Sequence, residues 1–443
     1  MNILKRIFCF SLFLLLLGAS IADAKAKNVI IMIADGWDFN HTAVLQYYTG
    51  TRPVYLDLNV KFPVSTFSAS GYKNPYPNAK PGYDPSVAWV SDGNGGLKPN
   101  IAYFMGPATD SAAAATALAT GRKTYDGYVN VTTDKKPLVT IARLAKQAGK
   151  AAGSISSVEL SHATPAVFGD AHNVSRGGYA EIAREMITSN MDVIMGAGNP
   201  LFDDNGVPAE RSYEFVGGQD IWKKLVSRGI PNLRLVQSLQ DFKKLANAKH
   251  PQGRYLGVAQ VFSTLQQART AGDPQSVHSE TLTKTVPTLA LMSKAAINAL
   301  SQNPNGFFLM IEGGAVDWAN HANQKGRLIE EMTGFNDAVK YVMDWIKQNG
   351  GWNDNLLIVT GDHDSGFLLG PNGETSITDN GKGNMPGMKF FSTGHANMLI
   401  PMFAQGPGSE LFSYYLSADT DPVRGRWIDN SSIFKVMKQQ IAE

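Results

Sequence analysis

The 443-residue sequence predicts an α/β fold, with a large, mainly parallel central sheet, helices on both faces and loop insertions. Continuous apolar runs at 28–34, 307–311 and 355–360 indicate strands that are buried on both faces, as in a parallel sheet. Stretches with helical character lie between these runs. Such alternation of strands and helices is typical of α/β folds.

The other elements follow in chain order. An alanine-rich run begins after Asp110 and ends at Gly121, a residue type that commonly terminates helices, so it predicts a helix. Residues 151–159 and 192–198 are expected to be strands. Apolar side chains at helical spacing predict a long helix over 327–348.

Residues 398–404 are expected to form the last strand. We expect a single domain over 25–443, because neither a repeat nor a linker is apparent. Residues 71–100 are rich in Gly, Pro, Asn and aromatic side chains, and 200–300 carry no recognisable motif. Both stretches are expected to be peripheral insertions.

Composition excludes several classes of protein. Apolar residues make up 43% and charged residues 18% of the chain, which excludes a disordered tail, a coiled coil and a collagen-like fibre. The 40 basic and 38 acidic side chains give a formal charge of +2. This balance argues against a nucleic-acid binder or a polybasic membrane binder, but it leaves a small anionic ligand open.

The N-terminus predicts export. Basic residues at 5–6, an apolar run over 7–17 and small residues at 22–24 follow the order of a secretory signal peptide. We therefore expect residues 1–24 to be removed and the protein to be periplasmic or secreted; an uncleaved anchor is the alternative. The only cysteine, Cys9, lies in this segment. The mature chain would then have no disulfide and no thiolate zinc site.

Potential metal ligands follow the three buried strands. Asp35 follows the first, Glu312 ends the second, and Asp362 and His363 follow the third. The carboxyl ends of parallel strands meet at one edge of a sheet, so these side chains should converge there. A single Asp after a strand is usually a turn or cap residue, but three such strands together favour a site. The further candidates are Asp317, His321 and His395.

The ligand types indicate more than one kind of ion. Asp and His without Cys suit a catalytic zinc site, whereas Asp, Glu and a Thr hydroxyl suit magnesium. Two ions can hold the attacking and the leaving oxygen of a phosphoryl displacement.

Ser111 lies where the alanine-rich helix begins. A helix N-terminus attracts anions, and a metal ion beside the hydroxyl would make it a nucleophile. The alternative is an ordinary capping serine, and Asp110 could equally be the cap.

These motifs resemble those of the alkaline phosphatase family. The resemblance rests on segments 28–36, 109–112, 162–165, 308–321, 359–363 and 394–395, which occur in family order along nearly the whole mature chain. It implies a parallel-rich sheet, phosphate monoester substrates, two zinc ions and one magnesium ion per chain. It also implies that Ser111 is the nucleophile that becomes phosphorylated.

The resemblance also implies the ligands of each ion. The first zinc ion would be held by Asp317, His321 and His395, and the second by Asp35, Asp362 and His363. Magnesium would share Asp35 and add Thr164 and Glu312. His162 matches a position that touches magnesium through water or a neighbouring metal. Arg176 matches the phosphate-binding arginine, although a surface arginine is the alternative, because its distance from Thr164 is one residue longer than expected.

The chain departs from the family pattern at two places. Trp318 occupies a position that is often Lys or His, which resembles a variant of some marine and cold-adapted bacterial enzymes. Asp364 follows His363, where an exposed turn residue is expected, or otherwise a carboxylate that supports the site. The other histidines outside the signal segment, His41, His172, His250 and His278, are expected to be structural.

Two other functions remain open from the sequence. A phosphodiesterase, nucleotide pyrophosphatase or sulfatase of the same superfamily would share the metal ligands, but Ser111 with Thr164 and Glu312 favours the monoesterase. A periplasmic metal- or phosphate-binding protein without turnover is the alternative from another class. Family members are commonly homodimers, which leaves a homodimer open, although no dimer motif is recognisable here.

Overall fold

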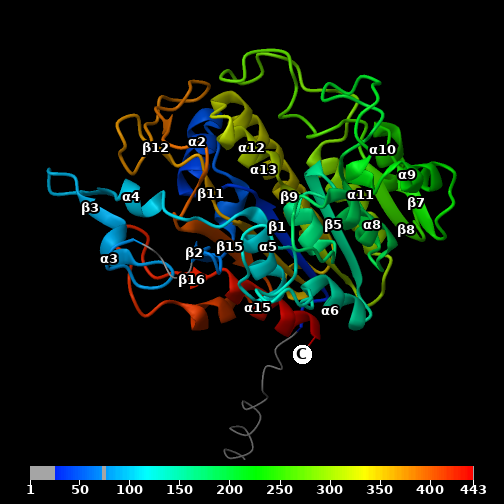
Figure 1. Cartoon of the computed structure of the whole chain (residues 1–443), viewed down its shortest axis with the longest axis horizontal. Coiled ribbons are helices and arrows are strands. Elements are labelled where there is room, and N and C mark those ends of the chain that lie inside the picture. The colour runs from blue at the N-terminus through cyan, green and yellow to red at the C-terminus, as the bar shows by residue number, and fades with distance from the viewer. Residues whose placement is uncertain (1–24, 72–75, 443) are drawn as a thin grey trace, which may run out of the picture.

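The computed structural model describes residues 25–71 and 76–442 (Figure 1). The expected signal peptide, residues 1–24, lies outside the described residues. Among the residues described, no helix is both long and apolar enough to cross a membrane.

Ten strands of the described chain form one central sheet. Across the sheet these are β16 (Ile428–Asp429), β2 (Val60–Ser65), β15 (Ile400–Gln405), β10 (Asn355–Gly361), β1 (Asn28–Ala34), β9 (Phe307–Gly313), β5 (Ala151–Glu159), β6 (Val193–Ala197), β8 (Arg254–Val258) and β7 (Leu233–Val236). The strands from β10 to β7 are all parallel, and β15 and β2 pair antiparallel. The predicted fold class is therefore confirmed.

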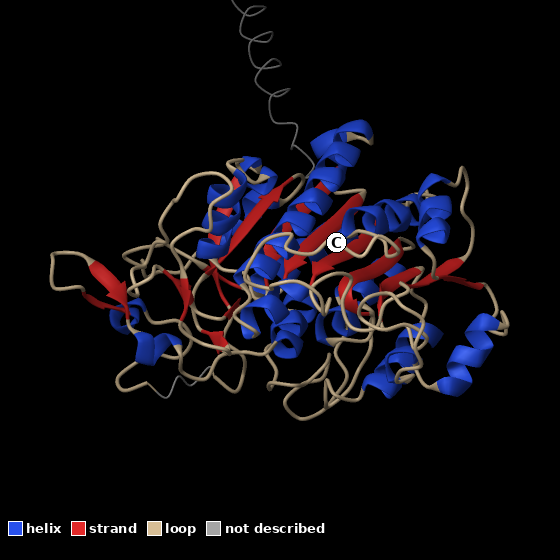
Figure 2. Ribbon diagram, turned by 90° about the horizontal axis from the view of Figure 1, so that it is seen from above, coloured by secondary structure: helices blue, strands red, loops and turns tan. Residues whose placement is uncertain are grey.

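Helices cover both faces of the sheet (Figure 2). One face carries α2 (Phe39–Thr49), α10 (Leu239–Asn247), α11 (Leu289–Leu300) and α13 (Lys325–Gln348). The other carries α5 (Ser111–Thr120), α6 (Ile141–Gln147), α7 (Ala163–Phe168), α8 (Tyr179–Thr188), α9 (Gln219–Val226) and α15 (Ser431–Ala442).

Strand β1 is apolar from Val29 onward because helices cover both faces of the sheet. Ile30, Met32 and Ala34 pack into the core on one face, while Val29, Ile31 and Ile33 pack into the core on the other. Because successive side chains of a strand point to opposite faces, a strand covered on both must be apolar throughout.

Short elements complete the chain. They are η1 (Val54–Asp57), α3 (Pro85–Ala88), β3 (Trp89–Ser91), β4 (Leu97–Pro99), α4 (Ile101–Phe104), η2 (Glu214–Val216), α12 (Ala315–His321), α14 (Gly351–Asp354), β11 (Asp364–Ser365), β12 (Leu368–Leu369), β13 (Lys389–Phe390), β14 (His395–Ala396) and η3 (Ser409–Tyr415). Strand β16 follows β15 in the chain, so the expectation that 398–404 form the last strand is wrong.

The two stretches without motifs have different structures. The described part of 71–100 contributes Tyr83 and Trp89 to a small aromatic cluster, and both donate hydrogen bonds of 2.6 Å to Asp421. In contrast, 200–300 contain β7 and β8, which form one edge of the central sheet.

Candidate active site

Three adjacent strands end in acidic side chains at the same edge of the sheet. Strands β10, β1 and β9 are neighbours, and their register aligns their carboxyl ends. Asp35 follows β1, Glu312 lies near the end of β9, Asp362 follows β10, and all three are fully buried. The sheet therefore brings together side chains that are far apart in the sequence.

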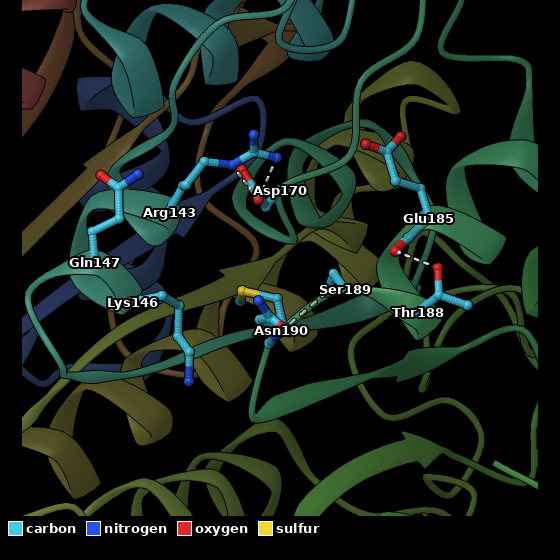
Figure 3. A pocket seen from close by; sticks show the side chains of 9 residues that line it. Arg143, Lys146, Gln147, Asp170, Glu185, Thr188, Ser189 and Asn190 are labelled. Atoms are coloured by element: carbon cyan, nitrogen blue, oxygen red, sulfur yellow. Dashed lines mark hydrogen bonds and ion pairs between the residues drawn. The ribbon is translucent and has the colours of Figure 1, made fainter. Parts of the chain in front are cut away.

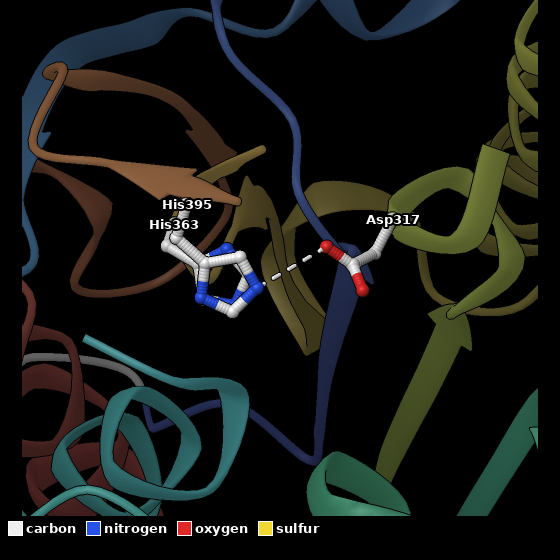
Figure 4. A group of neighbouring side chains, drawn as sticks. All are labelled: Asp317, His363 and His395. Atoms are coloured by element: carbon white, nitrogen blue, oxygen red, sulfur yellow. Dashed lines mark ion pairs between the residues drawn. The ribbon is translucent and has the colours of Figure 1, made fainter. Parts of the chain in front are cut away.

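A second set of ligands comes from α12 and β14. His321 lies one helical turn after Asp317, with Nε2 3.2 Å from Oδ2 of that carboxylate. His395 Nε2 is 3.5 Å from the other oxygen, and Figure 4 shows this ion pair. The Nε2 atoms of the two histidines are 3.1 Å apart. Pairing of β14 with β11 also stacks the His395 ring on that of His363, with centroids 3.7 Å apart.

Backbone carbonyls orient both histidines. The Nδ1 of His321 lies 2.5 Å from the oxygen of Thr393, and the Nδ1 of His395 lies 2.8 Å from that of Thr109. A nitrogen that faces a carbonyl oxygen must carry the proton. In both neutral rings the unprotonated nitrogen is therefore Nε2, and it faces Asp317. Metal-ligating histidines usually adopt this arrangement, with the other nitrogen bonded to a carbonyl oxygen or a carboxylate.

His363 joins the carboxylates to Ser111. Its Nε2 lies 3.5 Å from Oδ1 of Asp35, 3.2 Å from Oδ2 of Asp362 and 3.2 Å from Oγ of Ser111. Backbone N–H groups of Gly36 and His363 donate to the other oxygen of Asp362 and fix its orientation. Donor atoms of Asp35, Asp362 and His363 lie within 4.8 Å of one another.

Ser111 is the first residue of α5. Asp110 is the N-cap, and its side chain accepts a hydrogen bond of 3.0 Å from the N–H of Ala113. The structure thus favours Asp110 over Ser111 as the capping residue. The Ser111 hydroxyl remains beside His363, at a helix end that favours negative charge.

Arg176 lies beside the start of α5. Its Nη1 donates to Oδ2 of Asp110 at 2.9 Å, and its Nη2 donates to Nε2 of His162 at 3.2 Å. Its backbone N–H donates to the oxygen of Gly127. Asp110 and His162 thus hold the guanidinium beside the start of α5, near Ser111.

The remaining candidates from the sequence lie on β9 and at the start of α7. They are Glu312, His162 and Thr164. Thr164 and His162 lie at the start of α7, and both are buried. Glu312 Oε2 accepts a hydrogen bond from Ser156, a residue that the sequence analysis did not single out. Its only signal was a hydroxyl in a buried strand, one that it shares with Ser154 and Ser157. Trp318, half-buried on α12, packs edge-on against His162, with ring centroids 5.7 Å apart.

Electrostatics favour cations in this centre. Burial, and then repulsion from neighbouring carboxylates, raise the pKa of Asp35 well above its usual range and also raise that of Asp362. Burial likewise lowers the pKa of His363 well below its usual range, and the charge of His395 lowers it further. Neutral imidazole and closely spaced carboxylate oxygens are metal-ligating groups, so these residues fit divalent ions.

Asp364 is not the exposed turn residue expected from the sequence. It begins β11 and is fully buried, because pairing with β14 draws the chain after His363 into the interior.

His41 is also fully buried, with Nδ1 2.6 Å from Oδ1 of Asp38. Among the remaining histidines, His172 pairs with Glu185 at 2.8 Å.

His250 and His278 are exposed on the surface.

A large surface pocket lies elsewhere, between α6, α8 and the start of β6 (Figure 3). It measures about 550 Å³. Its charged residues pair with one another or with nearby partners: Arg143 with Asp170 at 2.8 Å, and Lys146 with Asp192 at 2.6 Å. It faces away from the carboxyl ends of the strands, so it is not part of this centre.

The chain matches the family model for alkaline phosphatase over residues 26–420. It is 30% identical over 372 residues to alkaline phosphatase of Escherichia fergusonii, which covers 78% of this chain and 72% of that protein.

Two solved structures share the fold. Alkaline phosphatase from the Antarctic bacterium TAB5 matches with a TM-score of 0.65 and 24% identity, over 94% of this chain and 98% of that one. A mutant of that enzyme has been solved with Mg bound in its M3 site. Cold-active alkaline phosphatase from a psychrophilic Shewanella matches with a TM-score of 0.66 and 24% identity, over 94% and 100% of the chains. The chain belongs to the alkaline phosphatase family.

Proposed function

We propose that this phosphomonoester hydrolase acts through a phosphoserine formed on Ser111, in a centre that holds two zinc ions and one magnesium ion. The observation that carries the proposal is the position of Ser111. Its Oγ lies 3.2 Å from Nε2 of His363, at the N-terminus of α5 and beside closely spaced Asp and His donors.

The family resemblance assigns the ligands of each ion, and their donor types suit that assignment. The first zinc ion is assigned to Asp317, His321 and His395, the second to Asp35, Asp362 and His363, and magnesium to Asp35, Thr164 and Glu312. His363 also lies within 4.8 Å of donor atoms of Asp317 and His395, so the two zinc groups adjoin. When bound, the ions supply positive charge that lowers the pKa of a hydroxyl nucleophile and stabilises the leaving oxygen.

The residues of the chain then perform two displacements. The Ser111 hydroxyl gives up its proton to solvent, and its Oγ forms a bond to phosphorus. The bond from phosphorus to the alcohol oxygen breaks, and the alcohol leaves with a proton from solvent. Water next attacks phosphorus, which releases inorganic phosphate and restores the serine hydroxyl. Arg176 can donate two parallel hydrogen bonds to phosphoryl oxygens in both steps, because Asp110 holds its guanidinium beside the helix start.

A hydrolysis panel tests the proposal. The purified protein is assayed on a phosphate monoester, a phosphate diester and a sulfate ester, with and without chelator, and its metals are counted. We expect the monoester to be the preferred substrate, and about two zinc ions and one magnesium ion per chain. Preference for the diester or the sulfate would assign the chain to another branch of the superfamily. If the protein binds metal or phosphate but hydrolyses none of the three esters, it would be a binding protein and not an enzyme.

The N-terminus supports a proposal about location. The order of charge, apolar run and small residues in 1–24 supports cleavage after residue 24 and release to the periplasm or medium. N-terminal sequencing of protein purified from the periplasmic fraction should begin at Lys25. A membrane-bound product that still carries Met1 would contradict cleavage.

A further inference from the structure

A second cluster of metal-ligating side chains lies beside the active site. Donor atoms of Asp38, His41 and Asp364 fall within 4.8 Å of one another, and at most 1% of each residue is exposed. Asp38 caps α2, His41 lies in its first turn, and Asp364 begins β11. None of the three is used in the hydrolysis proposed above.

Asp364 lacks a partner in this cluster. Neither carboxylate oxygen has a hydrogen-bond partner within the described part of the chain, although the side chain is fully buried. Asp38 and Asp317, which are also negative, repel its charge, and among the described residues only the backbone N–H of Ser365 acts in its favour. A buried carboxylate in such surroundings is costly unless a cation or a proton accompanies it.

Asn320 fixes the orientation of His41. The Asn320 amide nitrogen donates to the backbone oxygen of Gly36 at 2.9 Å, so its Oδ1, 3.1 Å from Nε2 of His41, must accept. The proton of His41 is therefore on Nε2.

The other ring nitrogen of His41 faces a carboxylate. Nδ1 accepts a hydrogen bond of 3.1 Å from the backbone N–H of Asp38 and lies 2.6 Å from Oδ1 of the same residue. An imidazole nitrogen that accepts a hydrogen bond presents a lone pair. At this separation the two atoms repel each other unless they share a proton or both bind a cation.

We propose that Asp38, His41 and Asp364 form a further site for a divalent cation, distinct from the three ions assigned to the catalytic centre. One imidazole and two carboxylates are the same donor types as in the Asp35, Asp362 and His363 group, so zinc is the ion that suits them. Ligands of tetrahedral zinc lie about 3.4 Å apart. Donors up to 4.8 Å apart would therefore have to close by up to about 1.4 Å, and Nδ1 of His41 and Oδ1 of Asp38, now 2.6 Å apart, would have to separate by about 0.8 Å.

An ion here would join three segments that carry catalytic ligands. Asp38 lies three residues after Asp35, Asp364 follows His363, and His41 contacts Asn320 on the helix of Asp317. The site is therefore a structural one that fixes the segments on which both zinc groups depend.

Anomalous diffraction tests the proposal directly. Crystals of the full mature protein, saturated with zinc, are measured at the zinc absorption edge. We expect an anomalous peak within bonding distance of Asp364 and His41. Absence of that peak would overturn the proposal and leave a proton shared between His41 and Asp38. Peaks at the catalytic centre alone would leave the proposed function intact, so the two failures can be distinguished.

Two variants provide a second readout. Asp364→Asn and His41→Gln alter the cluster from different elements, and each should lower the zinc content by one ion per chain, measured by mass spectrometry. Asp84→Asn is the matched control, since Asp84 is also fully buried but caps α3 with hydrogen-bonded oxygens. Unchanged zinc content in both cluster variants would contradict the proposal.

Discussion

Two regions of this molecule bury carboxylates, and they do so in opposite ways. At the carboxyl end of the sheet, Asp35 and Asp362 are fully buried, and burial, followed by repulsion from neighbouring carboxylates, raises the pKa of each. On α13, Glu330 is also buried, but its Oε2 lies 2.6 Å from Nη2 of Arg269 and 3.0 Å from Nη1 of Arg327.

The difference separates a structural cluster from a functional one. The chain itself supplies the cations of the Glu330 cluster, so that cluster needs no ligand. Within the described residues, no Arg or Lys forms an ion pair with Asp35 or Asp362, so the stability and the chemistry of the catalytic centre both depend on bound ions. The two regions should therefore respond differently to the same perturbations.

Metal removal should have the largest effect. Exhaustive chelation should abolish phosphate monoester hydrolysis and lower Tm, because ions that bind only the folded chain stabilise it by about 4 kcal/mol at 1,000 times Kd. A continuous hydrolysis assay and calorimetry measure both quantities. A reductant should have no effect, since the mature chain is expected to lack cysteine. An unchanged rate after metal removal would refute the mechanism with two zinc ions.

Breaking the paired cluster should reduce stability alone. Glu330→Gln leaves two buried arginines without their carboxylate, which should lower the free energy of unfolding by about 3–5 kcal/mol. Urea titration measures the change. Metal content and KM should stay as in the wild type. Glu410→Gln, at an exposed position, is the control and should be nearly neutral. Loss of zinc from Glu330→Gln would show that the two regions are coupled.

A change of pH should have a smaller effect than metal removal or Glu330→Gln, and it should act on zinc affinity. The hydrogen bond with Asp317 raises the pKa of His321 to about 9 in the metal-free chain. That proton stabilises the metal-free fold below about pH 6.5, and its contribution is lost as the pH rises through 9. An ion must displace it, so zinc affinity should increase by up to about tenfold per pH unit between 7 and 9. Calorimetric titrations that give equal affinities at both pH values would contradict this.

Trp318→Lys should have the smallest effect. A lysine beside His162 would add a positive charge that binds phosphate as well as it binds the transition state. We expect phosphate inhibition to tighten by up to about tenfold, with a lower kcat where product release limits the rate. Trp318→Phe controls for lost packing. If phosphate inhibition is unchanged while both kinetic constants worsen, the indole serves only to pack the wall of the site.

The sequence could predict the parts of the site that follow long apolar strands, but not the parts that depend on very short strands. Asp35, Glu312 and Asp362 each follow a buried apolar strand, and parallel strands must bring their ends together, so the convergence at this edge was predictable. The burial of Asp364 was not, because it depends on β11 pairing with β14, some 30 residues away, and each is only two residues long. Strand β16 was missed for the same reason, since two residues carry no periodic pattern.

Strands β7 and β8 show a different limit. Strand β7 is an edge strand and is only partly buried. Strand β8 beside it is mostly buried, but it is five residues long and contains Arg254 and Gly257, so neither strand has the continuous apolar run that marks β1. The cluster of Arg269, Arg327 and Glu330 left no motif either, because arginine and glutamate are common on exposed helix faces.

Trapping of the phosphorylated enzyme tests the central claim most directly. The protein is mixed with a labelled phosphate monoester, quenched in acid and digested, and the labelled peptide is sequenced. We expect the label on Ser111, and none in Ser111→Ala, whose hydrolysis rate should fall by about 10³-fold or more while its zinc content persists. Label on Thr109 or Thr116 instead, or a Ser111→Ala variant that turns over at the wild-type rate, would contradict the account.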